Sequence, residues 1–317
     1  MDFPNGFEGF GAFSDGESLK EKFQKQRGKM SRGKKVLLIV LIALLLLGIF
    51  AGQILNFVMQ VWQIQEIGSN FTDVFWKSFL CRLAVSASGF LLVFAVTSIN
   101  LFLLRKLALV KYSTAKLLGK KWPYLVAAVV LSFVFGGVFG KNAYIELLSA
   151  LNATEFGTQD PLFLKDIGYY IFTRPFLNTV VTALKSVFIL QIVLIAVLYF
   201  VVFFSTGMHT VKEMIKKERG ALCHVLFNVL VYYISMVVSY QLTAEGLLYK
   251  NFSGNGDVTG AGFIEANIWL PYYRIAPYLI LLAVVLAAVF LWRKKYAISI
   301  GAVLAVPAIY ICVLAAS

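Results

Sequence analysis

The sequence predicts an all-α fold: a polytopic transmembrane bundle of seven helical spans, with short amphipathic helices in the outer loops. Of the 317 residues, 60% are hydrophobic and only 14% are charged. The apolar residues form long blocks without the alternation that a membrane β-barrel requires. A helix needs about 20 apolar residues to cross the hydrocarbon core of a bilayer. Seven segments satisfy this: 36–58, 80–104, 123–140, 180–204, 221–242, 275–292 and 296–316.

Residues 1–35 precede the first span and are predicted to be a disordered, basic cytoplasmic tail. The tail begins with MDFPNGFEGFGAF, and glycine with isolated phenylalanines cannot form a packed core. Its basic half, which includes Lys29, Arg32, Lys34 and Lys35, could hold an anionic lipid or could act only as a topogenic signal. The first span follows 35 residues and lacks a small-residue cleavage pattern, so we expect it to be retained.

The orientation follows from the lysines and arginines, which account for the formal charge of +13. Most of the 29 basic residues fall in the tail and in the loops after the second, fourth and sixth spans. If the spans alternate, all these segments lie on one side, and by the positive-inside rule that side is the cytoplasm. The N-terminus is then cytoplasmic, the C-terminus is extracytoplasmic, and the bilayer explains the basic charge better than nucleic acid does.

The outer stretch FGTQDPLFLKDIGYYIFTRPF, Phe156 to Phe176, is too polar to cross a bilayer. Asp160 followed by Pro161 predicts a helix start, because the carboxylate can accept from first-turn N–H groups and proline loses no hydrogen bond there. The helix is expected to end before Pro175. About three amphipathic turns result, with Tyr170 on the apolar arc and Asp166 on the polar one.

Residues that could carry an enzymatic reaction are sparse. No HExxH, GxSxG or GxxxxGK[ST] pattern is present, and His224 has no neighbours at metal-ligand spacing. We therefore expect no enzymatic activity, no catalytic residues, no metal site and no cofactor.

Two basic residues lie within spans: Arg82 near the outer end of the second and Lys185 in the outer third of the fourth. Intramembrane ionisable residues are usually functional, although both side chains could instead extend to the outer headgroups. Together with Arg174 they would suit an anionic solute or lipid. We expect helix packing to be the role of the polar neutral side chains in spans, which are Asn100, Gln191, Asn228 and Gln241. We expect the same role for the pair Gly136 and Gly140.

Two segments carry a family resemblance. The first is LNATEFGTQDPLFLKDIGYYIFTRPFL, Leu151 to Leu177, and the second is GDVTGAGFIEANIWLPYYRI, Gly256 to Ile275. Both resemble signatures of the uncharacterised protein family 0182, a family of bacterial multi-pass membrane proteins. The matching positions are Asn152, Ala153, Thr154, Phe156, Gly157, Asp160, Pro161, Tyr170, Phe172, Pro175, Val258, Thr259, Gly260, Ala261, Asn267, Leu270 and Pro271.

The resemblance covers nearly everything after about residue 36, and it implies a location in the bacterial plasma membrane. It also implies that a large extracytoplasmic domain follows the seventh span in family members, whereas this sequence ends at Ser317. We therefore expect residues 36–317 to be the membrane half of a longer protein or a short homologue.

Two functional hypotheses follow. The first is a non-enzymatic membrane anchor and docking platform for an extracytoplasmic protein domain in the cell envelope. Its platform would be shaped by the outer-loop residues Asp160, Pro161, Asp166, Tyr170, Pro175, Thr259, Gly260 and Asn267. The alternative is a transporter or channel for an anionic solute or lipid that uses Lys185 and Arg82 as an intramembrane polar site.

Overall fold

The computed structural model describes residues 32–68, 71–110, 121–207, 213, 218–249 and 260–316. The chain divides into two compact units, Met1–Phe75 and Trp76–Ser317. The described residues are mostly helical, and the one pairing of β type among them is an isolated bridge between Gln159 and Asp166. The predicted all-α class is confirmed.

The first unit contains α2 (Arg32–Ile67) and the start of α3 (Thr72–Leu104). The predicted first span, 36–58, lies within α2. Phe57 and Phe75 bring their ring centroids to 5.9 Å from each other in this unit. Residues 32–35, which were predicted to belong to the disordered tail, are the first residues of α2, so that boundary is wrong. Residues 1–31 and many side chains of α2 lie outside the described part of the chain, so the span count of seven and the rest of the tail stay predictions.

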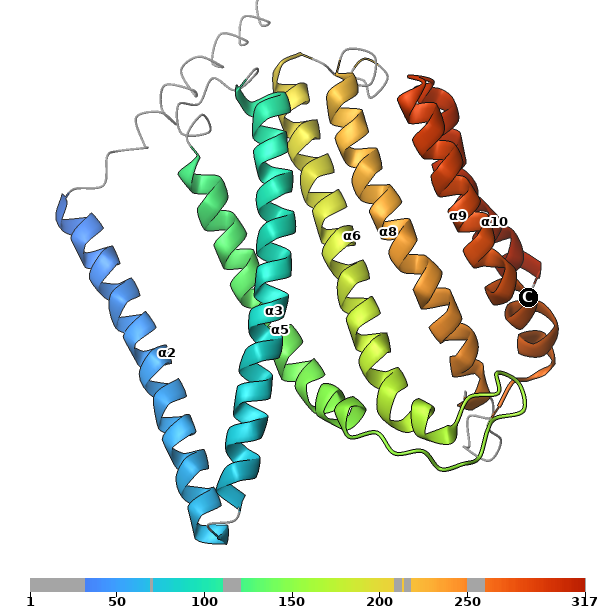
Figure 1. Ribbon diagram of the computed structural model, residues 1–317. Coiled ribbons are helices and arrows are strands. Elements are labelled where there is room, and N and C mark those ends of the chain that lie inside the picture. The colour runs from blue at the N-terminus through green and yellow to red at the C-terminus, as the bar shows by residue number, and fades with distance from the viewer. Residues whose placement is uncertain are drawn as a thin grey trace, which may run out of the picture. The chain divides into compact units, whose positions relative to one another are not determined.

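The second unit contains most of α3 and the five helices that follow it (Figure 1). These are α5 (Trp122–Leu151), α6 (Arg174–Ser205), α8 (Arg219–Gly246), α9 (Leu270–Trp292) and α10 (Tyr296–Ala316). In the described residues, these and α3 are the six helices long and apolar enough to cross a membrane. They contain the other six predicted spans, because uninterrupted apolar sequence of this length can satisfy its backbone only as helix in lipid.

The helices of the second unit alternate in direction, which gives the unit two ends. We call the end where α5, α8 and α10 begin the Trp122 end, and the end where α6 and α9 begin the Asp160 end (Figure 1). Within the unit α8 packs against α6 on one side and α9 on the other, and α10 packs on α9. One core cluster, around Leu104, Tyr199 and Ala221, joins α3, α5, α6 and α8 towards the Trp122 end.

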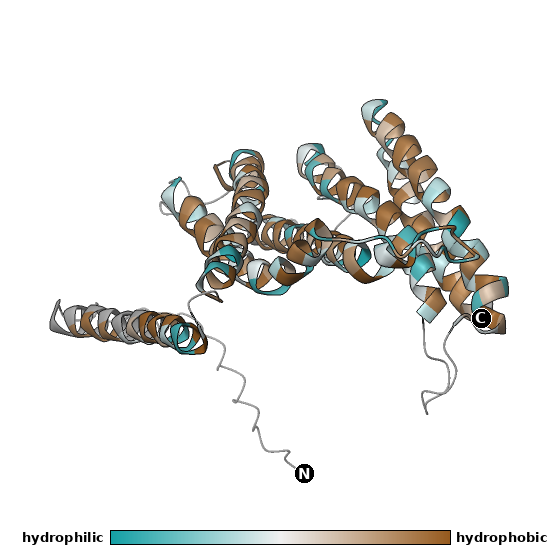
Figure 2. Cartoon of the chain, turned by 60° about the horizontal axis from the view of Figure 1, so that its bottom comes forward, coloured by the Kyte–Doolittle hydropathy of each residue, from teal (hydrophilic) through white to brown (hydrophobic). Residues whose placement is uncertain are grey.

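Many large apolar side chains are exposed on the outside of these helices. Phe133 is 73% exposed and Leu91 63%, whereas the most deeply buried positions include the small residues Ala128, Ala143 and Ala287. Figure 2 shows hydrophobic residues along the full length of the helices. This distribution suits lipid, where apolar burial does not drive helices together and small residues allow them to approach closely.

The contact between α3 and α5 depends on the two predicted packing glycines. A Cβ atom at Gly136 would lie 2.7 Å from the backbone oxygen of Ser86 and 3.0 Å from the Cβ of Phe90, and a Cβ at Gly140 would clash with the Ser86 side chain. The neighbouring Gly137 faces open space. The predicted small-residue contact is therefore confirmed.

The predicted separate helix between Asp160 and Pro175 is wrong. Residues 161–163 form a turn, Leu164 takes a left-handed φ of 57°, and helix begins only at residue 167. It then runs through a π-helical turn, η3 (Tyr169–Thr173), directly into α6. Pro175 does not stop it. The wide π turn ends at Thr173 and α6 begins at Arg174, so the proline lies in the first turn of α6, where no N–H is needed.

The same device occurs at the start of α9. A π-helical turn, η5 (Glu265–Trp269), precedes α9, and Pro271 again falls in the first α-helical turn. Both apolar helices are thereby extended at the Asp160 end by a turn of different pitch. Residues 250–259, in the outer loop between α8 and α9, lie outside the described residues.

We expect Gly136→Ala to lower the stability of the bundle by about 1–3 kcal/mol, because the new methyl group meets the rigid α3 backbone and forces the helices apart. Thermal unfolding of the purified protein in detergent measures this. Gly137→Ala is the matched control, since the same methyl group there meets nothing within 4 Å. Equal melting temperatures for the two variants would contradict the close α3–α5 contact.

Candidate functional site

The carboxylate of Asp160 orders part of the loop of residues 152–168 at the Asp160 end. Asp160 Oδ1 accepts from the N–H groups of Leu162 at 2.8 Å and Phe163 at 2.7 Å. Its Oδ2 accepts from the N–H of Lys165 at 3.0 Å and from the hydroxyl of Tyr170 at 2.7 Å. The carboxylate caps first-turn N–H groups as predicted, but it closes a turn instead of starting a helix.

Asp166 holds the two sides of the loop together. Its Oδ1 accepts from the N–H of Phe156 at 3.0 Å and of Gly168 at 2.7 Å. The backbone adds a bond from Ile167 N–H to the Thr158 oxygen at 3.0 Å. A Cβ at position 168 would clash with the Thr154 backbone oxygen, so this close approach requires Gly168.

These hydrogen bonds shift the pKa of each loop carboxyl. Partial burial alone would raise the pKa of Asp160, but the N–H of Phe163 and the hydroxyl of Tyr170 favour the ionised form, so the net shift is downward. The pKa of Asp166 is lowered chiefly by the N–H of Phe156 and also by that of Gly168, against a smaller opposing effect of desolvation. Both carboxylates are therefore ionised when the loop is formed.

Glu245, near the C-terminal end of α8, fastens this loop to the bundle. Its side chain is fully buried and has three partners. Lys165 Nζ donates to Oε1 at 2.6 Å, the Tyr169 hydroxyl donates to Oε2 at 3.0 Å, and Arg174 Nε lies 3.6 Å from Oε2. Burial alone would lower the pKa of Lys165, but its bond to Glu245 produces a net upward shift. Glu245 was not among the site residues predicted from the sequence, although a glutamate directly after an apolar span was a signal.

Arg174 belongs to the group of side chains around Glu245. Its guanidinium also donates to the Leu242 backbone oxygen and lies 4.8 Å from the ring centroid of Tyr249. Gly246 leaves room for it, because a Cβ there would lie 2.9 Å from a guanidinium nitrogen. The expectation that Arg174 could serve an anionic ligand is weakened, since Glu245 already provides its counter-charge.

The predicted outer-loop residues separate into two groups. Asp160, Pro161, Asp166 and Tyr170 meet in the ordered loop, and Pro175 begins the helix that follows it. Asn267 donates to the Phe263 oxygen of its own helix, and Gly260 has a φ of 123° that favours glycine. Neither is brought into the Asp160 loop by a described contact. Thr259 lies outside the described residues.

The two predicted intramembrane cations have different surroundings. Arg82 is exposed on α3 and lines none of the cavities described below. Lys185 is half-buried on α6, donates to Ser239 Oγ on α8 at 2.5 Å, and lines a cavity of about 420 Å³. Five tyrosines and five other residues complete its wall: Tyr232, Tyr233, Met236, Ser239, Tyr240, Thr243, Tyr273, Val306, Pro307 and Tyr310.

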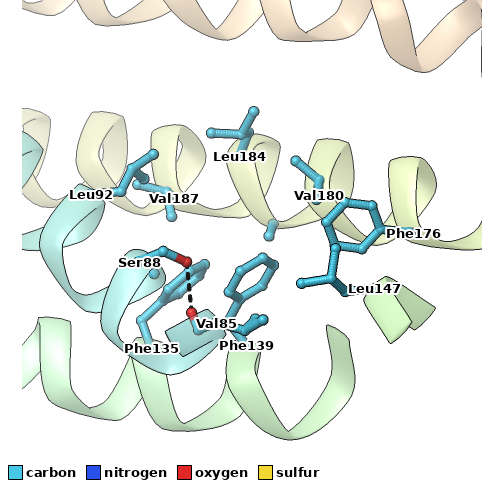
Figure 3. Close-up of a pocket in the computed structure, with 12 residues that line it drawn as sticks. Val85, Ser88, Leu92, Phe135, Phe139, Leu147, Phe176, Val180, Leu184 and Val187 are labelled. Carbon is cyan, nitrogen blue, oxygen red and sulfur yellow. Dashed lines mark hydrogen bonds between the residues drawn. The ribbon is translucent and has the colours of Figure 1, made fainter. Parts of the chain in front are cut away.

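A second cavity, of about 250 Å³, lies between α3, α5 and α6. Figure 3 shows side chains such as Phe139, Val180 and Leu184 around it. Its polar member is Ser88, whose hydroxyl donates to the backbone oxygen of Val85 at 2.8 Å. This cavity offers no charged group to a ligand.

A buried polar network links α3, α6 and α8, and only some of its members were predicted from the sequence. Asn100 Nδ2 donates to Asn228 Oδ1 at 3.0 Å and to Gln191 Oε1 at 3.3 Å. His224 Nε2 lies 2.9 Å from Asn100 Oδ1, which can only accept, so Nε2 carries the proton and Nδ1 accepts from the Tyr199 hydroxyl at 2.9 Å. Asn100, Gln191 and Asn228 thus bond between helices, as expected.

Gln241 differs from these three because it is exposed and has no described place in the network. In the described part of the chain, no group of three His, Cys, Asp or Glu side chains is arranged to hold a metal ion. Of the two cavities described above, the one at Lys185 has a cationic side chain in its wall.

These features define the class: a helical membrane protein with an ordered polar loop at one end of its bundle. The profile of the family described as Uncharacterised protein family (UPF0182) matches residues 36–317. The chain belongs to this family, as the two sequence motifs indicated.

Curated relatives carry the same family name. The chain is 29% identical over 277 residues to a UPF0182 protein of Caldicellulosiruptor saccharolyticus, which covers 87% of this chain and 30% of that protein. It is 28% identical over 251 residues to one of Clostridium perfringens, covering 76% and 27%, and 27% identical over 259 residues to one of Pelobacter propionicus, covering 77% and 28%. The chain thus spans less than a third of the length of these relatives. No solved structure matches it.

We expect Asp160→Asn to loosen the 152–168 loop, because hydrogen bonds to a charged acceptor are worth about 1.5–3 kcal/mol each. The asparagine amide is neutral and keeps only one accepting oxygen, since its NH2 group can only donate. Hydrogen exchange of the Leu162 and Phe163 amides measures the change, which should be at least about tenfold. Glu155→Gln, a neutralisation at an exposed position of the same loop, is the control. Unchanged protection in Asp160→Asn would show that the carboxylate does not order the loop.

The lowered pKa values also predict a pH dependence. The pKa of each carboxyl is lower in the folded loop than in the unfolded chain, where it is about 3.9. Each carboxylate therefore stabilises the loop fully at pH values above about 3.9, and this stabilisation is lost as the pH falls through the pKa of the folded loop. Protection of the Leu162 and Phe163 amides, corrected for intrinsic exchange, should therefore be flat from about pH 7 to pH 5 and fall below about pH 4. A loss of protection already near pH 6 would assign it to another group.

Proposed function

We propose that this chain is a non-enzymatic membrane anchor and docking platform for an extracytoplasmic domain in the bacterial cell envelope. It resides in the plasma membrane with the Asp160 end outside, the N-terminus in the cytoplasm and the C-terminus outside. The observation that carries the proposal is the loop of residues 152–168, which four hydrogen bonds to Asp160 hold in one conformation and Glu245 fastens to α8.

The surface that this loop presents supports docking. Leu164 is 68% exposed and Phe156 55%, and Ile171 on the adjoining π turn is also exposed. Phe156 stacks on Phe172 with ring centroids 6.2 Å apart. The hydrogen bonds of the loop already fix the backbone that carries these exposed apolar side chains. Little conformational entropy is therefore lost when a partner covers them.

The charge distribution supports the orientation. In the described residues, the Trp122 end carries Arg105, Lys106, Lys121, Arg219, Arg293, Lys294 and Lys295. The loop at the Asp160 end carries Glu155, Asp160, Lys165 and Asp166. The positive-inside rule assigns the first end to the cytoplasm. The greater length of the curated relatives supports a partner domain that belongs to the same polypeptide in those proteins.

The platform predicts a specific crosslink. With a photo-crosslinking amino acid at Leu164, irradiated membranes should yield an adduct with one extracytoplasmic polypeptide, and Asp160→Ala combined with Pro161→Ala should abolish it, because the loop then loses its conformation. The same amino acid at Phe133, an exposed position within a span, is the control and should crosslink lipid. Adducts at Leu164 with lipid alone, or with cytoplasmic proteins, would refute the platform.

A second candidate function is favoured by the cavity at Lys185. We propose as the alternative that the chain carries an anionic solute or lipid, since a cation within a span at the wall of a cavity of about 420 Å³ is a site for an anion. Enzymatic activity and a cofactor have no place in either proposal.

The carrier predicts substrate-selective flux in proteoliposomes. Lys185→Ala should reduce anion flux by about tenfold or more, because an intramembrane counter-charge is lost. Arg82→Ala should leave it unchanged, since Arg82 is exposed and lines no described cavity. Flux equal to that of protein-free liposomes would remove the carrier and leave the platform intact.

A further inference from the structure

We infer that the cavity at Lys185 is a binding site for an anionic amphiphile: a single carboxylate or phosphate headgroup at Lys185 and Ser239, with an alkyl chain along the tyrosine-rich wall. The inference names the ligand class of the cavity on which the proposed carrier also rests. It requires binding only, so it stands or falls independently of flux.

The first step concerns charge. Lys185 lies about 15 Å along α6 from Pro175, well inside the apolar segment. Its described hydrogen-bond partner is Ser239, which is neutral. Lys165 and Arg174 pair with Glu245, whereas Lys185 has no ion-pair partner among the residues that the structure describes. A cation in hydrocarbon without a protein counter-charge is complemented by an anionic ligand.

The second step concerns the nearest candidate counter-charge. Glu245 lies on α8, the helix that also carries Ser239, but its two carboxylate oxygens are already occupied by Lys165, Tyr169 and Arg174. It is also fully buried and does not line the cavity. The positive charge of Lys185 is therefore available to a ligand.

The third step concerns the remaining donors. Tyr233 donates its hydroxyl to the Val303 backbone oxygen, and the Tyr240 hydroxyl is bonded to that of Tyr272. The hydroxyl groups of three other lining tyrosines have no hydrogen-bond partner among the described residues: Tyr232, Tyr273 and Tyr310. A wall with one cation and several unengaged hydroxyl donors is suited to the oxygens of one anionic headgroup.

The fourth step concerns the shape and composition of the rest of the wall. Met236, Val306, Pro307 and the tyrosine rings make it mainly apolar, and the lining residues come from four helices, α6, α8, α9 and α10. The volume of about 420 Å³ falls in the range of sites for small organic molecules, about 300–1,000 Å³. A small hydrated anion would leave this apolar wall unused, whereas an alkyl chain would cover it. An amphiphile from the surrounding lipid fits both parts.

The test uses the whole chain purified in a neutral detergent and a palmitic acid that bears a photoactivatable diazirine. Irradiation should attach it to residues of α8 or α10 that line the cavity. Lys185→Gln should reduce the labelling by about tenfold or more, because the headgroup loses its counter-charge, and Lys185→Arg should retain it. Arg82→Gln is the matched control, since it removes a cation from another span that lines no described cavity.

Competition identifies the source of the anion. Unlabelled palmitate and lysophosphatidate should both displace the probe, whereas acetate and inorganic phosphate should not. Methyl palmitate should compete poorly, because it lacks the charge. Displacement by acetate or phosphate would refute an amphiphilic ligand and indicate a small soluble anion instead. Competition by methyl palmitate equal to that by palmitate would refute the role of the Lys185 charge.

A second variant keeps the inference falsifiable if Lys185→Gln does not fold. Thr243→Phe fills the cavity wall with a ring while leaving Lys185 and Ser239 in place, so it should also abolish the labelling. Melting temperatures establish that each variant is folded. Labelling that persists in folded Thr243→Phe, or that maps outside the cavity, would refute the site. Labelling with these properties but without flux would retain the site and remove the carrier.

Discussion

The structure depends on one constraint: a polar group carried into hydrocarbon must find its partner within the protein, since no water is available there. The network of Asn100, Gln191 and His224 satisfies it at the crossing of α3, α6 and α8, with each amide and imidazole group bonded to another side chain. Because lipid provides no hydrophobic force between helices, such bonds and the close contact at Gly136 contribute to holding the helices together.

The same constraint shapes the Asp160 end. Glu245 is buried at the end of α8, and a lone buried carboxylate would be strongly destabilising, so Lys165, Tyr169 and Arg174 converge on it. Their convergence draws the 152–168 loop onto the bundle and gives that end a fixed outer surface. The loop is thus ordered from two directions, by the carboxylate of Asp160 within it and by Glu245 beneath it.

Lys185 differs from Glu245 in having no charged partner among the described residues. Where Glu245 collects three partners, Lys185 has one neutral hydrogen bond and a cavity beside it. Glu245 and its partners therefore stabilise the fold, whereas the charge of Lys185 is available to a ligand in the cavity. Arg174 was grouped with Lys185 on the basis of the sequence. It is one of the groups that stabilise the fold, because it contacts the Glu245 carboxylate and donates to the Leu242 backbone oxygen.

The sequence by itself determined the helical membrane class, the positions of the six spans in the second unit and the role of Asp160 as a cap, because hydropathy, span length and capping are properties of short contiguous segments. Only the tertiary structure decided that Asp160 closes a turn instead of a helix, that Glu245 anchors the loop and that Lys185 borders a cavity. These outcomes depend on how each helix is rotated against its neighbours. That rotation brings together residues as distant as Asn100 and Asn228, 128 positions apart, and no local pattern encodes it.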